Sequence, residues 1–353
     1  MVEQSSHKTA NDTPSAGILP ASHWAHPDDE PSAAGNDDTS SLYTSDSFSS
    51  TTSVASSLRR FRSLHGRTYH SEIGNAVSWT PNDQKHIEML DLMHATCLTA
   101  IHEKLFLAPL DTEKLKSVLD VGTGAGHWAI DMGDLYPNAE VIGTDITPMQ
   151  PSWVPPNVSF QIDDANLEWT FSDNRFDFVH LRFLVGCITD WNAFYREAFR
   201  CTKPGGWIEH FEAYVHWYDD AEPIPEGSTL DIYNKAFSEA GKKAGRTFDV
   251  LPDDIQKKGM EAAGFVDIQV KDIKIPFGPW PEDAHEKELG LLAKAYTLAD
   301  LEGWLVFTFT EILGWEPEYT QVFIAHVRKE INNPKRKLSF RYRVVYGRKP
   351  ETS

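Results

Sequence analysis

Residues 117–126 read Ser-Val-Leu-Asp-Val-Gly-Thr-Gly-Ala-Gly. The apolar residues at the start of this stretch predict a short buried strand, and glycine follows it at 122, 124 and 126. Glycine allows a backbone to approach a ligand closely because it has no Cβ. In α/β proteins a glycine-rich loop after a strand often holds a nucleoside-bearing cofactor. The stretch therefore predicts a parallel sheet with a cofactor at the carboxyl ends of its strands.

Two acidic residues follow the glycine-rich loop at equal intervals. Asp145 lies 19 residues beyond Gly126, at the end of a second apolar strand. A carboxylate in that place accepts hydrogen bonds from both hydroxyls of a ribose. Asp164 comes 19 residues later, after a third apolar strand, and is placed to accept from an adenine amino group. The predicted cofactor contacts in these segments are Asp145, Ile146, Asp164 and Ala165.

The spacing of the glycines helps to distinguish S-adenosylmethionine from nucleotide cofactors that carry a pyrophosphate. A nicotinamide-binding loop usually reads G-x-G-x-x-G, whereas here the last glycine comes one residue earlier and an acid, Asp120, precedes the loop. A pyrophosphate prefers helix amides without a neighbouring carboxylate. The ammonium and sulfonium of S-adenosylmethionine favour a carboxylate, so the pattern favours this cofactor over NAD, FAD or ATP. The predicted loop contacts are Asp120, Gly122, Thr123, Gly124 and Gly126.

A fourth apolar segment, at 176–181, predicts another strand of the same sheet. Parallel strands end at a shared edge, so this strand reaches the same crevice as the glycine-rich loop. It ends in His-Leu-Arg, and we expect His180 and Arg182 to contact the methionine end of the cofactor. Four such elements in order indicate cofactor binding far more strongly than the glycines alone.

Strand and helix patterns alternate from residue 117 onward, which predicts an α/β fold with a doubly wound, mainly parallel sheet. We expect strands at 117–121, 140–144, 158–162, 176–181, 206–213, 265–275 and 339–346. We expect helices at 126–135, 190–201, 228–244 and 252–263, and a helical region rich in large apolar side chains at 281–331.

A further helix is predicted ahead of the sheet. Thr80 is expected as its N-cap, Pro81 as its first residue, and Asp83 as the partner in a capping box. Apolar residues at helical spacing continue it to about Leu107. The expected organisation is an acidic Ser/Thr-rich tail at 1–57, a helical cap at 58–110, the cofactor-binding core at 111–280, a helical lid at 281–335 and a closing strand with the C-terminal tail at 336–353.

Residues 1–57 differ in composition from the rest of the chain. Twenty of them are Ser or Thr and eight are Asp or Glu. Such a segment buries too little apolar surface to offset its ordering entropy, so we expect it to be disordered. The basic stretch Leu58-Arg-Arg-Phe-Arg62 follows. It is either a nuclear import or docking signal or, as we favour, a solvated edge where the fold begins.

The whole-chain composition narrows the partners. The 353 residues carry a formal net charge of −19, which argues against DNA or RNA as the main partner. Three widely spaced cysteines predict neither a disulfide framework nor a metal cluster. No apolar run long enough for a membrane span or a secretory signal is present. We expect a cytoplasmic or nuclear protein whose acceptor is a small molecule or a protein partner.

The order of these elements resembles that of the class I S-adenosylmethionine-dependent methyltransferases over about 117–213. A closer similarity, to the fungal LaeA-like methyltransferases, covers roughly 64–350 and is carried by Gly66-Arg-Thr-Tyr-His70, Pro81-Asn-Asp83, Leu90-Asp-Leu-Met-His94, Trp128-Ala-Ile-Asp131, 144–155 and Lys203-Pro-Gly-Gly-Trp-Ile-Glu209. This resemblance implies the seven-stranded methyltransferase fold, S-adenosylmethionine as methyl donor, and a role in or over secondary metabolism.

Methyl transfer is an in-line displacement, and alignment of the reactants can lower its barrier by roughly 7–11 kcal/mol. A base is required only where the acceptor must lose a proton. The candidate bases are His94, His180, His210, His216 and Tyr69. We favour His210, because it ends a strand beside Glu209 and Glu212, and name Tyr69 as a second catalytic candidate. The aromatic helices at 281–331 either pack a lid or line an apolar acceptor pocket.

Alternative functions stay open at this point. A nuclear regulatory protein that acts through protein partners is consistent with the resemblance and with the Ser/Thr-rich tail. A cofactor-binding protein without catalysis is disfavoured by the intact glycines and acids. A nicotinamide-dependent oxidoreductase is disfavoured by the glycine spacing.

Overall fold

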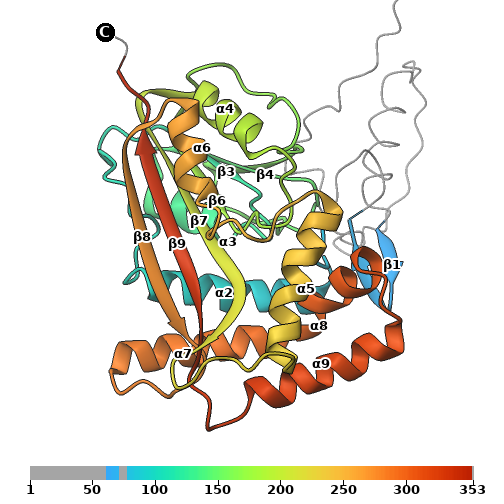
Figure 1. Ribbon diagram of the computed structural model, residues 1–353. Coiled ribbons are helices and arrows are strands. Elements are labelled where there is room, and N and C mark those ends of the chain that lie inside the picture. Colours follow the sequence, from blue (N-terminus) through green and yellow to red (C-terminus); the bar gives the residue numbers. More distant parts are fainter. Residues whose placement is uncertain (1–60, 71–77, 352–353) are drawn as a thin grey trace, which may run out of the picture.

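The computed structural model describes residues 61–70 and 78–351, and its centre is a sheet of seven strands (Figure 1). The strand order is β5-β4-β3-β6-β7-β9-β8. The first five strands in this order pair in parallel, whereas β9 runs antiparallel between β7 and β8. The bounds are β3 (Ser117–Val121), β4 (Glu140–Asp145), β5 (Val158–Ile162), β6 (Phe176–Arg182), β7 (Thr202–Asp219), β8 (Val266–Pro276) and β9 (Leu338–Arg348). The predicted mainly parallel sheet is confirmed.

Strand β3 lies in the middle of the parallel region, and every one of its residues is buried. A strand covered on both faces is mostly apolar, and Val118, Leu119 and Val121 supply the apolar side chains here, while the buried Asp120 is an exception. The glycine-rich loop follows, and helix α3 (His127–Leu135) begins directly after Gly126. The strand–loop–helix unit predicted from 117–135 therefore forms as expected, and the loop lies at the carboxyl edge of the sheet.

Helices cover both faces of the sheet. Helix α3 packs on β4 and β5, and α4 packs against α6, which also contacts β8 and β9. In Figure 1, α4 and α6 lie at one end of the molecule, while α2, α7, α8 and α9 gather at the other. The long strand β7 runs from the first group toward the second and contacts α5. The bounds are α4 (Trp191–Cys201), α5 (Thr229–Ala244) and α6 (Ile255–Ala263).

Helix α2 (Gln84–Ala100) corrects the predicted ends of the first helix. Its N-cap is Asp83, whose side chain accepts a hydrogen bond from the His86 amide, and Thr80 and Pro81 lie outside the helix. The helix stops seven residues before Leu107, because His102 and Glu103 adopt left-handed backbone conformations. Neither residue is a glycine, so the sequence carried no local signal for this end.

The region 281–331 is helical as predicted, but it is divided into several segments. Helix α7 ends at Ala299, and Asp300 then caps α8 by accepting from the Gly303 amide. Gly314, with φ of 78°, separates a π-helical turn from α9. The bounds are α7 (Ala284–Ala299), α8 (Leu301–Phe307), η2 (Thr308–Ile312) and α9 (Pro317–Ile331).

A small hairpin precedes α2 and was not predicted. Strands β1 (Arg62–Leu64) and β2 (Arg67–Tyr69) pair antiparallel across a tight turn. His65 and Gly66 form this turn, both with positive φ, as two-residue hairpin loops require. The backbone of Asn82 donates to that of Thr68, so the hairpin is fastened to the segment before α2.

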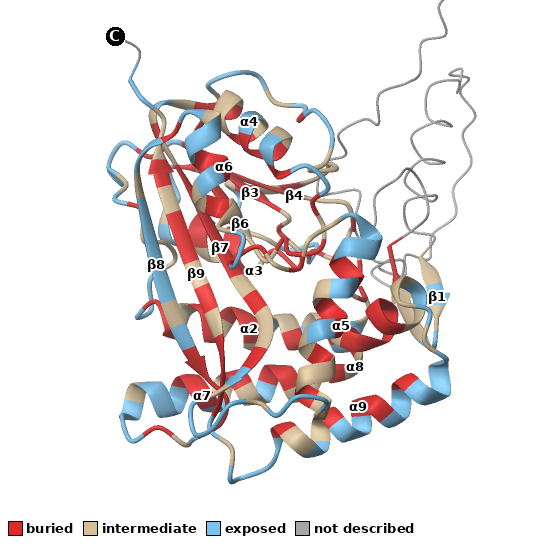
Figure 2. Cartoon of the chain, viewed as in Figure 1, coloured by how far each residue is buried: buried red, intermediate tan, exposed pale blue. Residues whose placement is uncertain are grey.

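Figure 2 shows that buried residues follow the sheet and the inward faces of the helices, while β8 and the outer face of α9 are exposed. Within 61–70 and 78–351 no helix is long and apolar enough to cross a membrane. The acidic tail at 1–57 and the basic residues Arg59 and Arg60 lie outside the described residues, so the predictions made for them stay predictions. Arg62 is described, and its Nε donates to the carbonyl of His70.

Candidate active site

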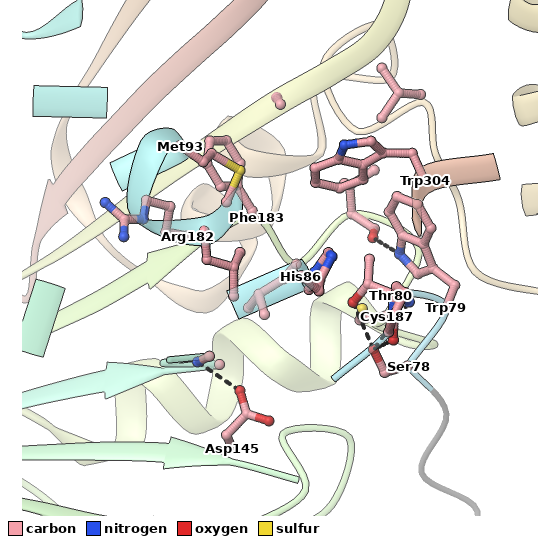
Figure 3. Close-up of a pocket in the computed structure, with 18 of the residues that line it drawn as sticks. Ser78, Trp79, Thr80, His86, Met93, Asp145, Arg182, Phe183, Cys187 and Trp304 are labelled. Atoms are coloured by element: carbon pink, nitrogen blue, oxygen red, sulfur yellow. Dashed lines mark hydrogen bonds between the residues drawn. The ribbon is translucent and has the colours of Figure 1, made fainter. Parts of the chain in front are cut away.

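A cavity of about 250 Å³ lies over the carboxyl ends of the parallel strands and continues along β7 (Figure 3). One end, here called the glycine end, is lined by predicted cofactor contacts: Gly122, Thr123, Gly124, Asp145, Ile146, Asp164 and Ala165. The other end, here called the aromatic end, is lined by Trp79, Tyr214, Trp217, Tyr233, Phe237, Tyr296, Trp304, Phe340 and Tyr342. Segments far apart in the sequence therefore enclose one space.

The glycine-rich loop presents bare backbone to the cavity. Gly124 has φ of 57°, and a Cβ built there meets no atom closer than the Leu90 Cδ1 at 3.9 Å. Since Leu90 also lines the cavity, a side chain at position 124 would enter the space itself. Gly126 is required for another reason, because a Cβ there would lie 2.5 Å from the Phe160 ring. Gly124 therefore leaves room for a ligand, whereas Gly126 permits packing and does not line the cavity.

Asp145 is the last residue of β4, and its carboxylate binds the backbone of the glycine-rich loop. Its Oδ2 accepts from the Gly124 amide at 2.8 Å, and its Oδ1 accepts from the Thr147 amide at 2.9 Å. A carboxylate oxygen has more than one lone pair, so both oxygens can still accept from ribose hydroxyls. Burial raises the pKa of Asp145 to about 6, although the two amides act in the opposite direction. Figure 3 shows this carboxylate beside the loop backbone.

Asp164 lies on the same side of the cavity, one segment further along the sheet. Its Oδ1 accepts from the Asn166 amide and side chain at 2.9 and 3.2 Å. No hydrogen bond to Oδ2 is formed within the described part of the chain, which leaves this oxygen for a donor in the cavity. Ile146 and Ala165 add apolar surface on either side. This arrangement fits an adenosine with its ribose toward Asp145 and its amino group toward Asp164.

Asp120 and His180 do not line the cavity, contrary to the direct contacts expected of them. Asp120 turns inward, where its carboxylate accepts from the Thr123 hydroxyl at 2.6 Å and bonds the His180 Nδ1 at 2.7 Å. His180 is fully buried and stacks on Trp128 with ring centroids 3.7 Å apart. Burial lowers the pKa of His180 to about 4, so the ring is neutral and donates to Asp120. Asp120 and His180 therefore stabilise the glycine-rich loop through buried contacts and do not face the cavity.

Arg182 lines the cavity as predicted, at the end of β6. His127, the first residue of α3, lines it too and was not predicted. Its Nε2 lies 2.6 Å from Asp91, whose side chain is mostly exposed. Figure 3 shows the Arg182 guanidinium at one side of the cavity. A guanidinium in this place suits a ligand carboxylate.

The favoured catalytic candidates do not reach the cavity. The cavity meets β7 only from Ala213 onward, whereas the His210 ring packs against Trp191 and Tyr195 of α4. His210 is fully buried, with Nδ1 2.6 Å from the Tyr195 hydroxyl and Nε2 3.2 Å from the Glu212 carboxylate. Tyr69 is fully buried beside Phe307. The cause is the alternation of side chains along strands, which sequence alone does not orient toward a site.

Two other histidines named as possible bases, His94 and His216, also lie outside the cavity lining. Cys187 lies in the lining, but burial raises its pKa to about 12, so its thiol stays protonated and is no nucleophile. Within 61–70 and 78–351 no group of three or more His, Cys, Asp or Glu is arranged to hold a metal ion.

The aromatic end contains no charged side chain among its described lining residues. All of its residues except Trp304 are less than a tenth exposed. Trp79 reaches it from the segment before α2, where the indole donates to the Val185 carbonyl at 2.8 Å. Tyr296 and Trp304 come from α7 and α8, so the region predicted as a lid does line this pocket in part. Sequence reasoning missed the contribution of 78–82, which is too short to show periodicity.

Comparison with known proteins places similar chains among fungal proteins. Residues 93–270 match the family described as Methyltransferase domain. Methyltransferase pytC of Aspergillus terreus is 37% identical over 306 residues, which cover 86% of this chain and 93% of that protein. Secondary metabolism regulator LAE1 of Cochliobolus heterostrophus is 33% identical over 279 residues, covering 77% and 89%. Secondary metabolism regulator laeA of Aspergillus flavus is 30% identical over 294 residues, covering 82% and 78%.

Proposed function

Because this chain belongs to the methyltransferase domain family and is an S-adenosylmethionine-dependent methyltransferase, we propose that it methylates a small, uncharged and largely apolar molecule of fungal secondary metabolism. The similarity to pytC and LAE1 supports the metabolic setting. The acceptor class is supported by the aromatic end of the cavity, and this is the observation that carries the proposal.

The character of the aromatic end favours a planar apolar acceptor. Its lining side chains are aromatic, and those of Trp79, Phe237 and Tyr342 are almost completely buried. A charged acceptor would lose its hydration there without gaining a partner, which costs several kcal/mol per charge. An aromatic acceptor instead gains stacking and edge contacts with the surrounding rings. A cavity of about 250 Å³ suits a small molecule better than the surface of a protein.

The residues at the glycine end fit S-adenosylmethionine. We propose that Asp145 binds the ribose hydroxyls, Asp164 binds the adenine amino group, and Arg182 binds the methionine carboxylate. When bound, the cofactor supplies a methyl group activated by its sulfonium. The chain contributes by aligning the acceptor with that methyl group and by excluding water with apolar side chains such as Leu90 and Met93, both of which line the cavity.

We further propose roles for the segments around the core. Residues 58–110 act as a cap, since α2 supplies Leu90 and Met93 to the cavity. Residues 281–335 act as a lid over the aromatic end, to which they supply Tyr296 and Trp304. Helix α2 of the cap packs against helix α7 of the lid, so the two segments together form one wall of the cavity.

A labelling experiment tests the function. The purified full chain is incubated with S-adenosylmethionine carrying a radioactive methyl group and with metabolite extracts from a fungus. We expect label in small apolar products extractable into organic solvent, and none with the Gly124→Val variant, whose side chain would enter the glycine end. Label confined to protein would instead favour a regulatory role like the one named for LAE1. No transfer to either fraction would contradict the proposal.

A further inference from the structure

His86 combines two properties that a catalytic base in this cavity needs. It lies in the first turn of α2 and lines the cavity, where Figure 3 places it among the other lining side chains. Its Nδ1 lies 2.9 Å from Oδ2 of Asp300, a carboxylate that is fully buried. Its ring makes a T-shaped contact with that of Trp304, a residue of the aromatic end, with centroids 5.8 Å apart.

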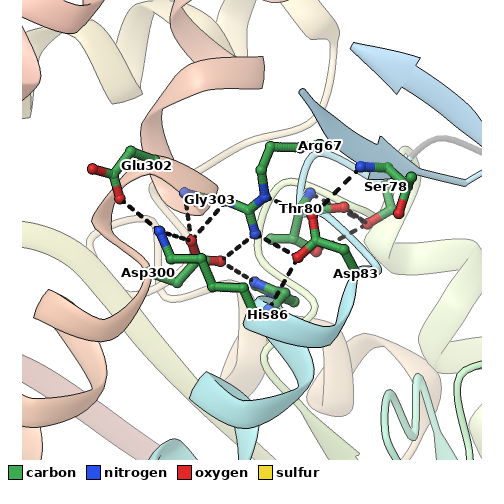
Figure 4. Close-up of polar contacts among 10 residues, drawn as sticks. Arg67, Ser78, Thr80, Asp83, His86, Asp300, Glu302 and Gly303 are labelled. Atoms are coloured by element: carbon green, nitrogen blue, oxygen red, sulfur yellow. Dashed lines mark hydrogen bonds and ion pairs between the residues drawn. The ribbon is translucent and has the colours of Figure 1, made fainter. Parts of the chain in front are cut away.

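Asp300 is held rigidly. It accepts from the Arg67 guanidinium at 2.7 and 2.9 Å, from His86, and from the Gly303 amide at 3.2 Å (Figure 4). Burial acts to raise the pKa of Asp300, but the hydrogen bonds from His86 and Arg67 outweigh it and keep the pKa well below its usual range. The carboxylate is therefore ionised and fixed in orientation at neutral pH.

The contact with Asp300 selects the tautomer of His86. An ionised carboxylate only accepts hydrogen bonds, so the Nδ1 of His86 carries a proton and donates it to Asp300. The lone pair of a neutral ring then lies on Nε2. Within the described residues Nε2 has no hydrogen-bond partner, and it is the ring nitrogen left to serve the cavity. This is the geometry of a base oriented by a carboxylate.

The cations near Asp300 are shared with other carboxylates, so the Asp300 charge can still stabilise a protonated His86. Arg67 is shared, because it also binds both oxygens of Asp83, at 2.5 and 2.7 Å. Lys85, at 3.5 Å from Asp300, is closer to Glu302, at 3.1 Å. Glu302 is also bound by Arg328 of α9, so the three carboxylates are matched by three cations, from the hairpin, α2 and α9, and none of these cations is left unpaired against His86.

We propose that His86 is the general base for methyl transfer, that Asp300 positions it, and that the acceptor is an aryl or enol hydroxyl. This inference rests on the proposed function and specifies its substrate class. A thioether or a thiolate acceptor would need no base, whereas a hydroxyl in an apolar pocket is a poor nucleophile until it loses its proton.

The step balances as follows for a hydroxyl acceptor. The hydroxyl proton passes to Nε2 of His86, and the oxygen forms a bond with the methyl carbon. The bond between that carbon and sulfur breaks, and sulfur keeps the electron pair, which gives S-adenosylhomocysteine and a methyl ether. The imidazolium is stabilised by Asp300 and then releases its proton to solvent.

His94 provides a matched control on the same helix. It lies eight residues further along α2, and its Nε2 also bonds a carboxylate, Asp131, at 2.9 Å. His94 does not line the cavity, and the Asp131 carboxylate is partly exposed, whereas that of Asp300 is fully buried. The two histidines therefore share their helix and their type of partner but differ in access to the acceptor.

The test compares two acceptors of the same shape, 2-naphthol and 2-naphthalenethiol, with the full chain and labelled S-adenosylmethionine. Near neutral pH the naphthol is un-ionised, whereas the aryl thiol is largely ionised. The sulfonium of the bound S-adenosylmethionine offsets the negative charge that the thiolate sulfur brings to the methyl group, so this acceptor needs no base. We expect His86→Gln to slow methylation of the naphthol by about 10²–10³-fold. The loss should shrink as pH rises toward about 10, where a phenol ionises by itself. Methylation of the thiol should change by less than about threefold.

Two controls accompany the test. His94→Gln should leave both rates within about threefold of wild type, and calorimetry with S-adenosylhomocysteine should show unchanged cofactor binding in both variants. An equal loss on both acceptors would make His86 a packing residue, and no loss on the naphthol would overturn its role as base. Wild type that labels fungal metabolites but not the naphthol would overturn the hydroxyl assignment, while leaving the methyltransferase function standing.

Discussion

At the scale of single residues, Asp145 joins the glycine-rich loop to the proposed cofactor site. Its carboxylate accepts from backbone amides of Gly124 and Thr147 and also faces the cavity. The cost of burying it is visible in its pKa, which burial raises to about 6. A group tuned in this way changes its charge close to neutral pH, and its charge is needed for the ribose hydroxyls to find an acceptor.

We therefore expect cofactor affinity to depend on pH through Asp145. Because its pKa in the free protein is raised, Asp145 takes up a proton as pH falls below about 6, and affinity for S-adenosylhomocysteine should fall by about tenfold for each further pH unit. Calorimetry between about pH 5 and pH 8 measures this. Asp145→Asn should bind at least about tenfold more weakly at neutral pH and lose the pH dependence, whereas Asp134→Asn, on the exposed side of α3, should match wild type. A flat profile in wild type would contradict this assignment.

At the scale of elements, the loop between β3 and α3 is defined by its backbone conformation as much as by its side chains. Gly122, Gly124 and Gly126 all have positive φ, a conformation that costs other residues about 1–2 kcal/mol. Only Gly124 combines this conformation with open space toward the cavity. A substitution at Gly124 can therefore be compared with one at another positive-φ glycine, so that loss of ligand binding is distinguished from loss of stability through backbone strain.

Gly124→Ala and Gly245→Ala form a matched pair for this test. Gly245, at the C-terminal end of α5, has φ of 66° and no atom within 4 Å of a built Cβ. Both changes should lower the free energy of unfolding by about 1–2 kcal/mol in urea titrations. Only Gly124→Ala should weaken S-adenosylhomocysteine binding, by more than about tenfold, because its methyl group enters the glycine end. Equal affinities in the two variants would show that the loop backbone does not contact the cofactor.

At the scale of the whole molecule, Arg67 connects three parts of the chain. It belongs to the N-terminal hairpin, binds Asp83 at the start of α2, and binds Asp300 between α7 and α8, 233 residues away in sequence. Figure 4 shows the guanidinium between the two carboxylates. The same cluster orients His86, so one ion-pair network closes the wall of the cavity and places the proposed base.

Removal of the Arg67 guanidinium should be costly. Arg67→Met leaves the fully buried Asp300 carboxylate short of its main cation, and we expect the free energy of unfolding to fall by about 3–5 kcal/mol. Arg175→Met, which removes a cation from an exposed pair with Glu140, should cost no more than about 1 kcal/mol. Chemical denaturation of the two variants measures the difference. Similar stabilities would mean that the cluster does not hold the hairpin to the lid.

The sequence by itself determined the parts of this protein that depend on local pattern. Strands β3 and β5 have the predicted bounds, because apolar runs between turn residues define them. The spacing of the glycines and of Asp145 and Asp164 predicted that these residues meet at one edge of the sheet, because consecutive parallel strands bring such residues together, and they do line one end of the cavity. The membership in a methyltransferase family agrees with that pattern.

Only the tertiary structure decided which side chains line the cavity. His210 and Tyr69 have side chains able to accept a proton, but both are fully buried in packed protein. No local pattern marks His86 as a candidate base, because its partner Asp300 lies 214 residues away in the sequence. The end of α2, the hairpin and the wall formed by Trp79 and Trp304 likewise depend on contacts between distant segments. The direction of a side chain and the partner of a buried charge are set by packing, which no local sequence pattern records.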